Sequence, residues 1–102
     1  MSLQDARKLI GSPNAASQGF WPRAAAVLVR QSLEEQVLKH LGPDYASCSM
    51  RAKLLLLEDK LGPQRAGELA YLYGALSQAC HYHPYQSPPT AEELRDWIAR
   101  LS

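Results

Sequence analysis

Two Gly-Pro pairs divide this chain into segments with a helical pattern, and they constrain its fold more than any other feature. Gly42-Pro43 and Gly62-Pro63 each combine a residue that ends helices with one that cannot continue them. Pro84 and the pair Pro88-Pro89 interrupt the pattern again further along the chain. No run of useful length shows the alternation of apolar and polar residues that is typical of a strand. The sequence therefore predicts helices separated by short connections.

The segments between these stops predict five helices. Their ranges are 3–10, 21–41, 48–61, 63–82 and 91–101. The residues expected to face the core recur at helical spacing: Met50, Leu54, Leu57 and Leu61 in the third helix, Leu69, Leu72, Tyr73, Leu76 and Cys80 in the fourth, and Leu94, Trp97, Ile98 and Leu101 in the last.

Local signals mark where some of these helices begin. Either Ser47 or Ser49 is placed to cap the third helix, because a hydroxyl at this position accepts a bond from an otherwise unpaired amide. Thr90 and Glu93 form the capping-box pattern at the start of the last helix. Gly74 lies inside the fourth helix, where a glycine costs about 1 kcal/mol relative to alanine. We expect this glycine to allow the close approach of a neighbouring helix.

The length of the chain and of its connections decides how these helices are arranged. A chain of 102 residues fits one domain, which we assign to residues 1–102. Short connections make consecutive helices antiparallel neighbours. We predict an all-α fold, an antiparallel four-helix bundle with a short additional N-terminal helix.

The composition argues against several classes of protein. Eleven basic residues nearly balance ten acidic residues, which does not indicate a strongly electropositive nucleic-acid binder. The start of the chain carries Asp5, Arg7 and Lys8, unlike a signal peptide. No run approaches the roughly 18 apolar residues of a membrane span. We expect a cytoplasmic protein without membrane contact, in which Cys48 and Cys80 are free thiols.

The densest group of chemically versatile side chains lies at the end of the predicted fourth helix, in the run Cys80-His81-Tyr82-His83-Pro84-Tyr85. A helix places the two histidines about 200° apart, and no second His or Cys pair follows, so we expect no metal site. Because Pro84 ends the helix, these rings are expected to form a partly exposed surface beside Pro88-Pro89. Such rings stack on bases or contact a protein partner, although they also simply cover helix ends. The binding candidates here are His81, Tyr82, His83 and Tyr85.

Charged residues supply three further binding candidates. Arg30 and Glu34 are four residues apart in the long second helix, so they can pair along one face, either solvated or part of a polar network. Arg51 stands with Lys53 at the start of the third helix, beside serine hydroxyls. Exposed basic groups and free backbone amides at a helix start are suited to binding a phosphate.

One stretch of the long second helix predicts self-association. The run Ala24–Val29 is apolar on every side of its helix. Apolar surface beyond what one small bundle covers usually marks an interface. We therefore expect a homodimer.

Sequence motifs for enzymatic chemistry are absent. The chain contains no phosphate-binding glycine loop, nucleophile elbow, His-Glu-x-x-His motif or CxxC pair. Catalysis by a Ser-His-Asp or Cys-His group would have to be assembled across helices. We accordingly expect no cofactor, name no catalytic residue and favour a binding protein over an enzyme.

Three segments carry a resemblance to a known family. The run 21–35 resembles the opening long helix of HEPN-type domains, the nucleotide- and RNA-associated helical bundles of prokaryotic defence and toxin systems. Segments 76–85 and 89–97 are similar to small bacterial proteins of the same group. The resemblance implies a cytoplasmic bacterial helical bundle in a toxin-antitoxin or phage-defence context.

The same resemblance bears on catalysis. HEPN ribonucleases usually carry an Arg that is followed within a few residues by a His, and no Arg stands at that distance before His40, His81 or His83. The resemblance therefore implies a non-cleaving, dimeric member that binds a protein partner or RNA. Two alternatives stay open. One is a metal-independent ribonuclease that combines His81 or His83 with an arginine from another helix or protomer, and the other is a plain protein-interaction module.

Overall fold

The computed structural model describes residues 21–81 and 87–101, and these residues form four α-helices and one short 3-10 helix. In chain order they are α3 (Trp21–Leu41), η1 (Pro43–Tyr45), α4 (Met50–Leu61), α5 (Pro63–Cys80) and α6 (Ala91–Leu101). The described part of the chain contains no β-strand, so the prediction of an all-α fold is confirmed. The predicted helix over residues 3–10 lies outside the described residues.

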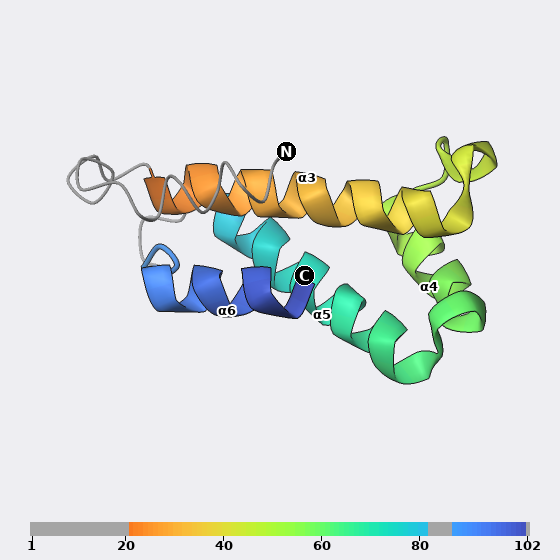
Figure 1. The fold of residues 1–102 in the computed structure, drawn as a ribbon. Coiled ribbons are helices and arrows are strands. Elements are labelled where there is room, and N and C mark those ends of the chain that lie inside the picture. Colours follow the sequence, from red (N-terminus) through yellow and green to blue (C-terminus); the bar gives the residue numbers. More distant parts are fainter. Residues whose placement is uncertain (1–20, 82–86, 102) are drawn as a thin grey trace.

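The long helix α3 organises the other three (Figure 1). It is in contact with α4, α5 and α6. Figure 1 shows α4 leading away from the C-terminal end of α3, and α5 returning toward the end where α3 begins. Helix α6 lies along the first half of α3. The start of α3, the end of α5 and the start of α6 therefore meet at one end of the molecule, and α4 lies at the other.

The two Gly-Pro pairs end helices as predicted. Gly42 and Gly62 have φ angles of 103° and 85°, a backbone conformation that glycine adopts without the steric cost of a Cβ. The amide of Gly42 still donates to the carbonyl of Leu38 at 2.7 Å, which closes the last turn of α3. The prolines that follow begin η1 and α5, where a missing N–H costs nothing.

Side-chain caps fix the starts of α4 and α6. Of the two serines that were candidates for capping α4, Ser49 is the cap, and its hydroxyl accepts from the amide of Ala52 at 3.2 Å. At α6 the amide of Thr90 donates to the Glu93 carboxylate and the amide of Glu93 donates to the Thr90 hydroxyl, both at 3.1 Å. The predicted capping box is therefore confirmed.

Two predicted boundaries are wrong by two residues each. Helix α4 begins at Met50 instead of residue 48, because Ser49 is its cap and its backbone is extended. Helix α5 ends at Cys80 instead of residue 82, because His81 has an extended backbone with φ −89° and ψ 140°. The chain thus leaves the helix before it reaches Pro84, which lies outside the described residues.

The core is aliphatic and draws on all four α-helices. Most of the predicted inner residues of α5 and all four of α6 are buried, as is Leu57 of α4. The fully buried large side chains are Val29, Leu33, Val37, Leu57, Leu69, Leu72, Leu76, Leu94 and Leu101. Met50, Leu54, Leu61, Tyr73 and Cys80 pack against this cluster and are partly buried. The predicted helical stripes therefore identify the core residues, although some of these residues are only partly buried.

Helix α6 is also tied to α5 at its far end. The Arg65 guanidinium donates to the carbonyl of Arg100 at 2.8 Å, and it forms a salt bridge with Glu68 on its own helix. Asp96 and Arg100 pair at 3.0 Å along the exposed face of α6. The last carbonyls of a helix have no partner within it, so the Arg65 bond satisfies one of them across helices.

Two expectations about packing need correction. Within the run Ala24–Val29, residues Ala25, Ala26 and Val29 are fully buried in a single chain, and Ala24 alone is exposed. This run therefore leaves little apolar surface for a second copy.

Gly74 is exposed, and a Cβ placed there would meet no atom within 4 Å, so the expected close approach of a neighbouring helix is wrong. The spacing of apolar residues could not reveal this, because it does not position the neighbouring helix.

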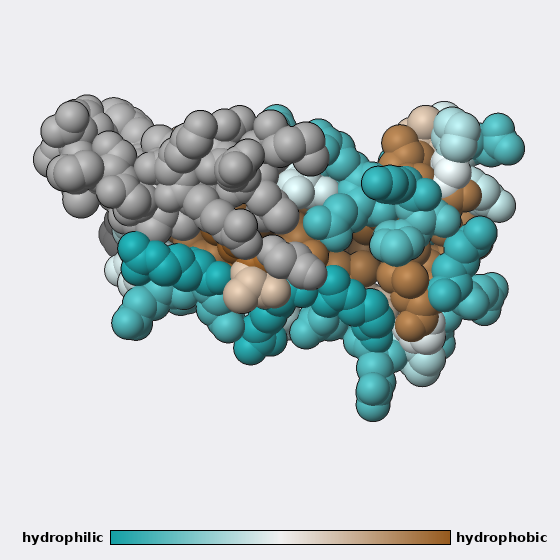
Figure 2. Space-filling view, in the orientation of Figure 1, coloured by the Kyte–Doolittle hydropathy of each residue, from teal (hydrophilic) through white to brown (hydrophobic). Residues whose placement is uncertain are grey.

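The exposed apolar residues lie elsewhere. Leu55 on α4 is 69% exposed and Tyr71 on α5 is 61% exposed, with Leu56 and Tyr45 less so. In Figure 2 hydrophobic residues reach the surface around the end of the molecule that contains α4. Among the described residues, none of the helices has the length and apolar character needed to cross a bilayer.

Candidate polar cavity and its surroundings

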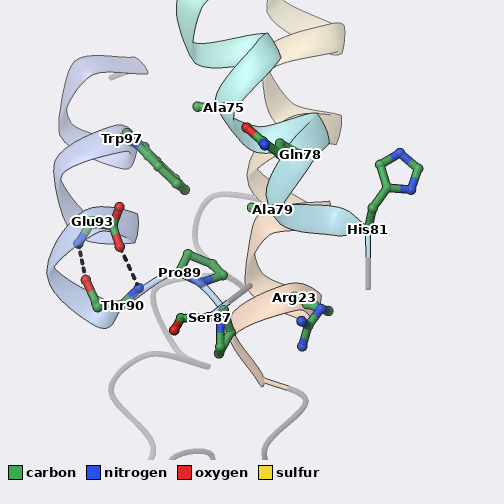
Figure 3. Close-up of a pocket in the computed structure, with 11 residues that line it drawn as sticks. Arg23, Ala75, Gln78, Ala79, His81, Ser87, Pro89, Thr90, Glu93 and Trp97 are labelled. Atoms are coloured by element: carbon green, nitrogen blue, oxygen red, sulfur yellow. Dashed lines mark hydrogen bonds between the residues drawn. The ribbon is translucent and has the colours of Figure 1, made fainter. Parts of the chain in front are cut away.

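A cavity of about 410 Å³ opens at the end of the molecule where α3 begins and α5 ends (Figure 3). Helix α3 contributes Arg23 from its first turn, α5 contributes Gln78, and His81 follows directly after α5. The third wall comes from the start of α6 and the segment that leads into it. Three helix termini therefore enclose a single open space, which we call the polar cavity.

The histidine stands at the rim of the polar cavity because α5 ends just before it. The amide of His81 donates to the carbonyl of Gln78 at 3.2 Å, and its side chain is exposed. Figure 3 shows the imidazole pointing away from Trp97 and the α6 wall. Pro88 and Pro89 line the same cavity as His81, while the other rings of the predicted surface lie outside the described residues.

The α6 wall combines a mostly buried aromatic ring with a capping carboxylate. Trp97 is only 9% exposed, and Figure 3 shows its ring directed toward the cavity. The Glu93 carboxylate accepts from the amide of Thr90 and sits at the positive end of the α6 dipole. This negative group is therefore compensated by its own helix start, while the basic residues Arg23 and His81 lie on the opposite α3–α5 side.

A small polar cluster lies between α3 and α5 next to the cavity. Burial raises the pKa of the Cys80 thiol, while the charge of Arg30 lowers it and that of Glu34 raises it. Arg30 Nε and Ser77 Oγ are buried without a hydrogen-bond partner. Neither salt bridge among the described residues involves Arg30 or Glu34, so the pairing that their spacing allowed is not made.

The structure separates the predicted binding candidates. His81 lines the cavity, whereas Arg30 and Glu34 do not line it and instead influence the Cys80 thiol electrostatically. Arg51 is exposed at the other end of the molecule, in a groove between α4 and α5. The remaining three candidates, Tyr82, His83 and Tyr85, lie outside the described residues.

The expected phosphate site at the start of α4 is not assembled as predicted. The Ser49 hydroxyl already binds an amide of the first turn. Lys53 was expected to be exposed but is buried, because its aliphatic stem lies on the inner side of α4, one turn before the buried Leu57. Arg51 is therefore the one exposed basic side chain of that first turn.

Sequence reasoning missed three residues of the cavity. Arg23 was not singled out, although it stands seven residues before Arg30 and so on the same face of α3. Gln78 carried no signal of its own. Trp97 was assigned correctly to the core, but its helical stripe gave no indication that one edge also lines a cavity.

Metal binding finds no support in the described part of the chain. No three His, Cys, Asp or Glu side chains among the described residues come close enough together to hold a metal ion. Cys48 and Cys80 are both free thiols, as predicted.

Comparisons with known proteins add no identification. No protein-family model matches the chain, and no curated protein and no solved structure matches it either. The chemistry of the site therefore rests on the side chains themselves: two basic groups, an amide and a mostly buried aromatic ring around an open cavity.

Proposed function

We propose that this protein is a HEPN-like four-helix-bundle protein that binds a short single-stranded stretch of RNA at the polar cavity without cleaving it. The observation that carries this proposal is that two basic residues from different parts of the chain, Arg23 in α3 and His81 just after α5, line one open cavity. Guanidinium and imidazole groups both donate hydrogen bonds to phosphate oxygens. The resemblance of residues 20 to 98 to HEPN-type domains supports the same class of ligand.

The dimensions of the cavity fit this ligand. Its volume of about 410 Å³ lies at the lower end of the range for small-molecule sites, so it holds one nucleotide and not a folded partner. Gln78 offers an amide for the edge of a base, and Trp97 offers an apolar wall. With a formal net charge of only +1, affinity depends on these local contacts more than on the overall charge of the protein.

A protein partner fits this end of the molecule less well. Large exposed apolar side chains are the usual anchors of protein interfaces, and those of the described residues lie on α4, α5 and η1. None of them lines the polar cavity. We therefore assign RNA to the cavity. If no RNA binds, the alternative function is that of a plain protein-interaction module.

The resemblance also supplies the cellular context of the proposal. We propose a cytoplasmic bacterial protein that acts as a homodimer in a toxin-antitoxin or phage-defence system. Partner binding by a non-catalytic member of such a system needs a stable fold and an accessible recognition site, and it requires no cofactor.

The test is RNA binding by variants that differ only in where one positive charge is removed. Fluorescence anisotropy with a labelled single-stranded oligoribonucleotide gives the dissociation constant of the wild type, Arg23→Gln and Arg95→Gln. Arg95 is exposed on α6 and does not line the cavity, so it is the matched control. We expect Arg23→Gln to weaken binding about tenfold, and to reduce the salt dependence by about 0.7 in the log-log slope if one phosphate contact is lost. Equal losses for both variants, or no RNA binding by the wild type, would contradict the proposal.

A second candidate function follows from the same pair of residues. A composite site of Arg23 and His81 contains the groups that metal-independent RNA cleavage uses, an imidazole for proton transfer and a guanidinium for the phosphate. In that reaction a 2′-hydroxyl attacks the adjacent phosphorus and the 5′-oxygen leaves, which yields a 2′,3′-cyclic phosphate. Incubation of labelled RNA with the protein in EDTA distinguishes the two functions. Cyclic-phosphate products that His81→Asn abolishes would replace the binding proposal with a ribonuclease.

A further inference from the structure

A second surface, at the opposite end of the molecule from the polar cavity, has a different chemistry. Helices α4 and α5 enclose an open groove of about 310 Å³. Six of its lining residues are apolar or small: Leu54, Leu55, Pro63, Ala66, Gly67 and Ala70. Figure 2 shows hydrophobic residues at the surface in this part of the molecule. We call this surface the α4–α5 groove.

The groove combines a protruding side chain with a hollow. Leu55 is 69% exposed, so its apolar surface contributes little to the core of a single chain. On α5 a Cβ at Gly67 would meet no atom within 4 Å, so the space above this glycine is open. A glycine inside a helix lowers its stability, and packing within the chain gives no reason for one at this position. A leucine side chain from another molecule fits above Gly67 and Ala70.

Two opposite charges frame the leucines of α4. Arg51 and Glu58 are seven residues apart, hence on the same face of the helix and about 10 Å apart along its axis. Both are exposed and both line the groove. Each charge stands at the helix end that its sign disfavours, since the N-terminal end carries the positive pole of the dipole. Stability of α4 alone therefore does not explain their positions.

We propose that a second copy of this chain occupies the α4–α5 groove, with the two α4 helices antiparallel about a two-fold axis that passes between Leu54 and Leu55. In this arrangement Arg51 faces the second copy's Glu58, and Glu58 faces the second copy's Arg51. Each Leu55 enters the hollow above the second copy's Gly67. A two-fold interface requires that one patch complement itself. This patch carries one charge of each sign, and it also carries a protruding leucine and a hollow that can receive one.

Charge decides between this arrangement and its parallel alternative. A parallel pair of α4 helices sets Arg51 against Arg51 and Glu58 against Glu58, which places like charges together at both ends of the leucines. The antiparallel pair turns both into opposite-charge contacts. The inference names the surface of the homodimer that is part of the proposed function, and it is independent of RNA binding at the polar cavity.

Sedimentation equilibrium over about 1 to 100 µM protein tests the proposal. We expect the wild type to be a dimer in equilibrium with monomer. Arg51→Glu and Glu58→Arg are each expected to raise the dissociation constant about tenfold, because each creates two like-charge contacts per dimer. The double variant Arg51→Glu/Glu58→Arg restores opposite-charge contacts and is expected to return to within about threefold of the wild type. Both swaps suit the dipole of α4, so a weaker fold cannot account for weaker dimers.

A matched pair of leucine variants locates the interface. Leu55→Gln removes the protruding side chain and is expected to raise the dissociation constant about tenfold or more. Leu56→Gln is the control, because Leu56 is also exposed on α4 but does not line the groove. Both leucines are exposed, so neither change is expected to unfold the monomer.

Three results would overturn the inference. The first is a wild type that stays monomeric at about 100 µM, in which case the groove binds a different molecule. The second is a dimer that Leu55→Gln and Leu56→Gln affect equally, which would place the homodimer interface on another face. The third is a double charge variant no stronger than its single parents, which would exclude the antiparallel register. RNA binding at the polar cavity is measured separately through Arg23→Gln, so its failure leaves these outcomes unchanged.

Discussion

The two ends of this molecule share helix α5 but present different groups at their surfaces. At the polar cavity three helix termini meet, and the polar groups that line it include the basic side chains of Arg23 and His81 and the amide of Gln78. At the α4–α5 groove two regular helices lie side by side, and the exposed groups are leucine, alanine and glycine with one charge of each sign. Helix ends present polar groups and helix faces present apolar ones, so the two ends suit different ligands.

The two surfaces also differ in how far their residues are buried in the core. The α6 wall of the cavity is part of the core, since Trp97 lines the cavity while remaining 9% exposed. The protruding Leu55 of the groove contributes little to the core. A substitution of Trp97 therefore disturbs fold and site together, whereas a substitution of Leu55 changes mainly the surface.

The largest expected effect is that of removing the cavity wall. Trp97→Ala is expected to lower the free energy of unfolding by about 3–5 kcal/mol, because it deletes a large buried ring and leaves a cavity. Leu55→Ala, by contrast, is expected to change the stability of the monomer by less than about 0.5 kcal/mol. Urea denaturation at low protein concentration, where dimers dissociate, measures both. Similar losses for the two variants would show that the groove is part of the fold and would break the contrast.

A smaller effect compares the two helix caps, one at each end of the molecule. Thr90→Ala removes a hydroxyl that caps α6 beside the polar cavity, and Ser49→Ala removes one that caps α4 near the groove. Each is expected to cost about 1 kcal/mol of stability. Only Thr90→Ala is expected to weaken RNA binding as well, because Thr90 lines the cavity. If Ser49→Ala weakened RNA binding equally, loss of stability alone would explain both results.

These caps also show which part of the structure is accessible from sequence. Helix boundaries depend on short-range chemistry, so Gly42-Pro43 and the Thr90–Glu93 pair predicted them closely, while the choice between Ser47 and Ser49 left the start of α4 open by two residues. That Arg23 and His81 line one cavity depends on how α3 and α5 are placed across the molecule, which no local pattern contains. The exposure of Leu55 could not be predicted either. The apolar stripe identifies the inner face of α4, but it does not show whether another helix covers the outer face.

The next prediction uses two glycines of α5 that lie in different surroundings. Gly67 lines the groove and Gly74 does not, and a Cβ added at either position would meet no atom of the same chain within 4 Å. Alanine at either position is expected to stabilise the monomer by about 0.5–1 kcal/mol, since alanine favours the helix. Gly67→Ala is expected to weaken the dimer several-fold by filling the hollow, and Gly74→Ala is expected to leave it unchanged. Thermal unfolding and sedimentation equilibrium measure the two effects, and equal dimer constants would remove Gly67 from the interface.

The smallest expected effect concerns the polar cluster next to the cavity and appears only at alkaline pH. Burial raises the pKa of the Cys80 thiol above its ordinary value, with Arg30 opposing and Glu34 reinforcing the shift. The folded protein therefore holds this proton more firmly than the unfolded chain does. The stability that this provides is fully present below the unfolded pKa and is lost as the pH rises through the folded pKa. Urea midpoints measured from neutral to alkaline pH should fall less steeply for Cys80→Ala than for the wild type. Identical slopes for Cys80→Ala and the wild type would mean that the Cys80 thiol is solvated in the folded protein, and that the cluster between α3 and α5 is open to water like the rim of the polar cavity.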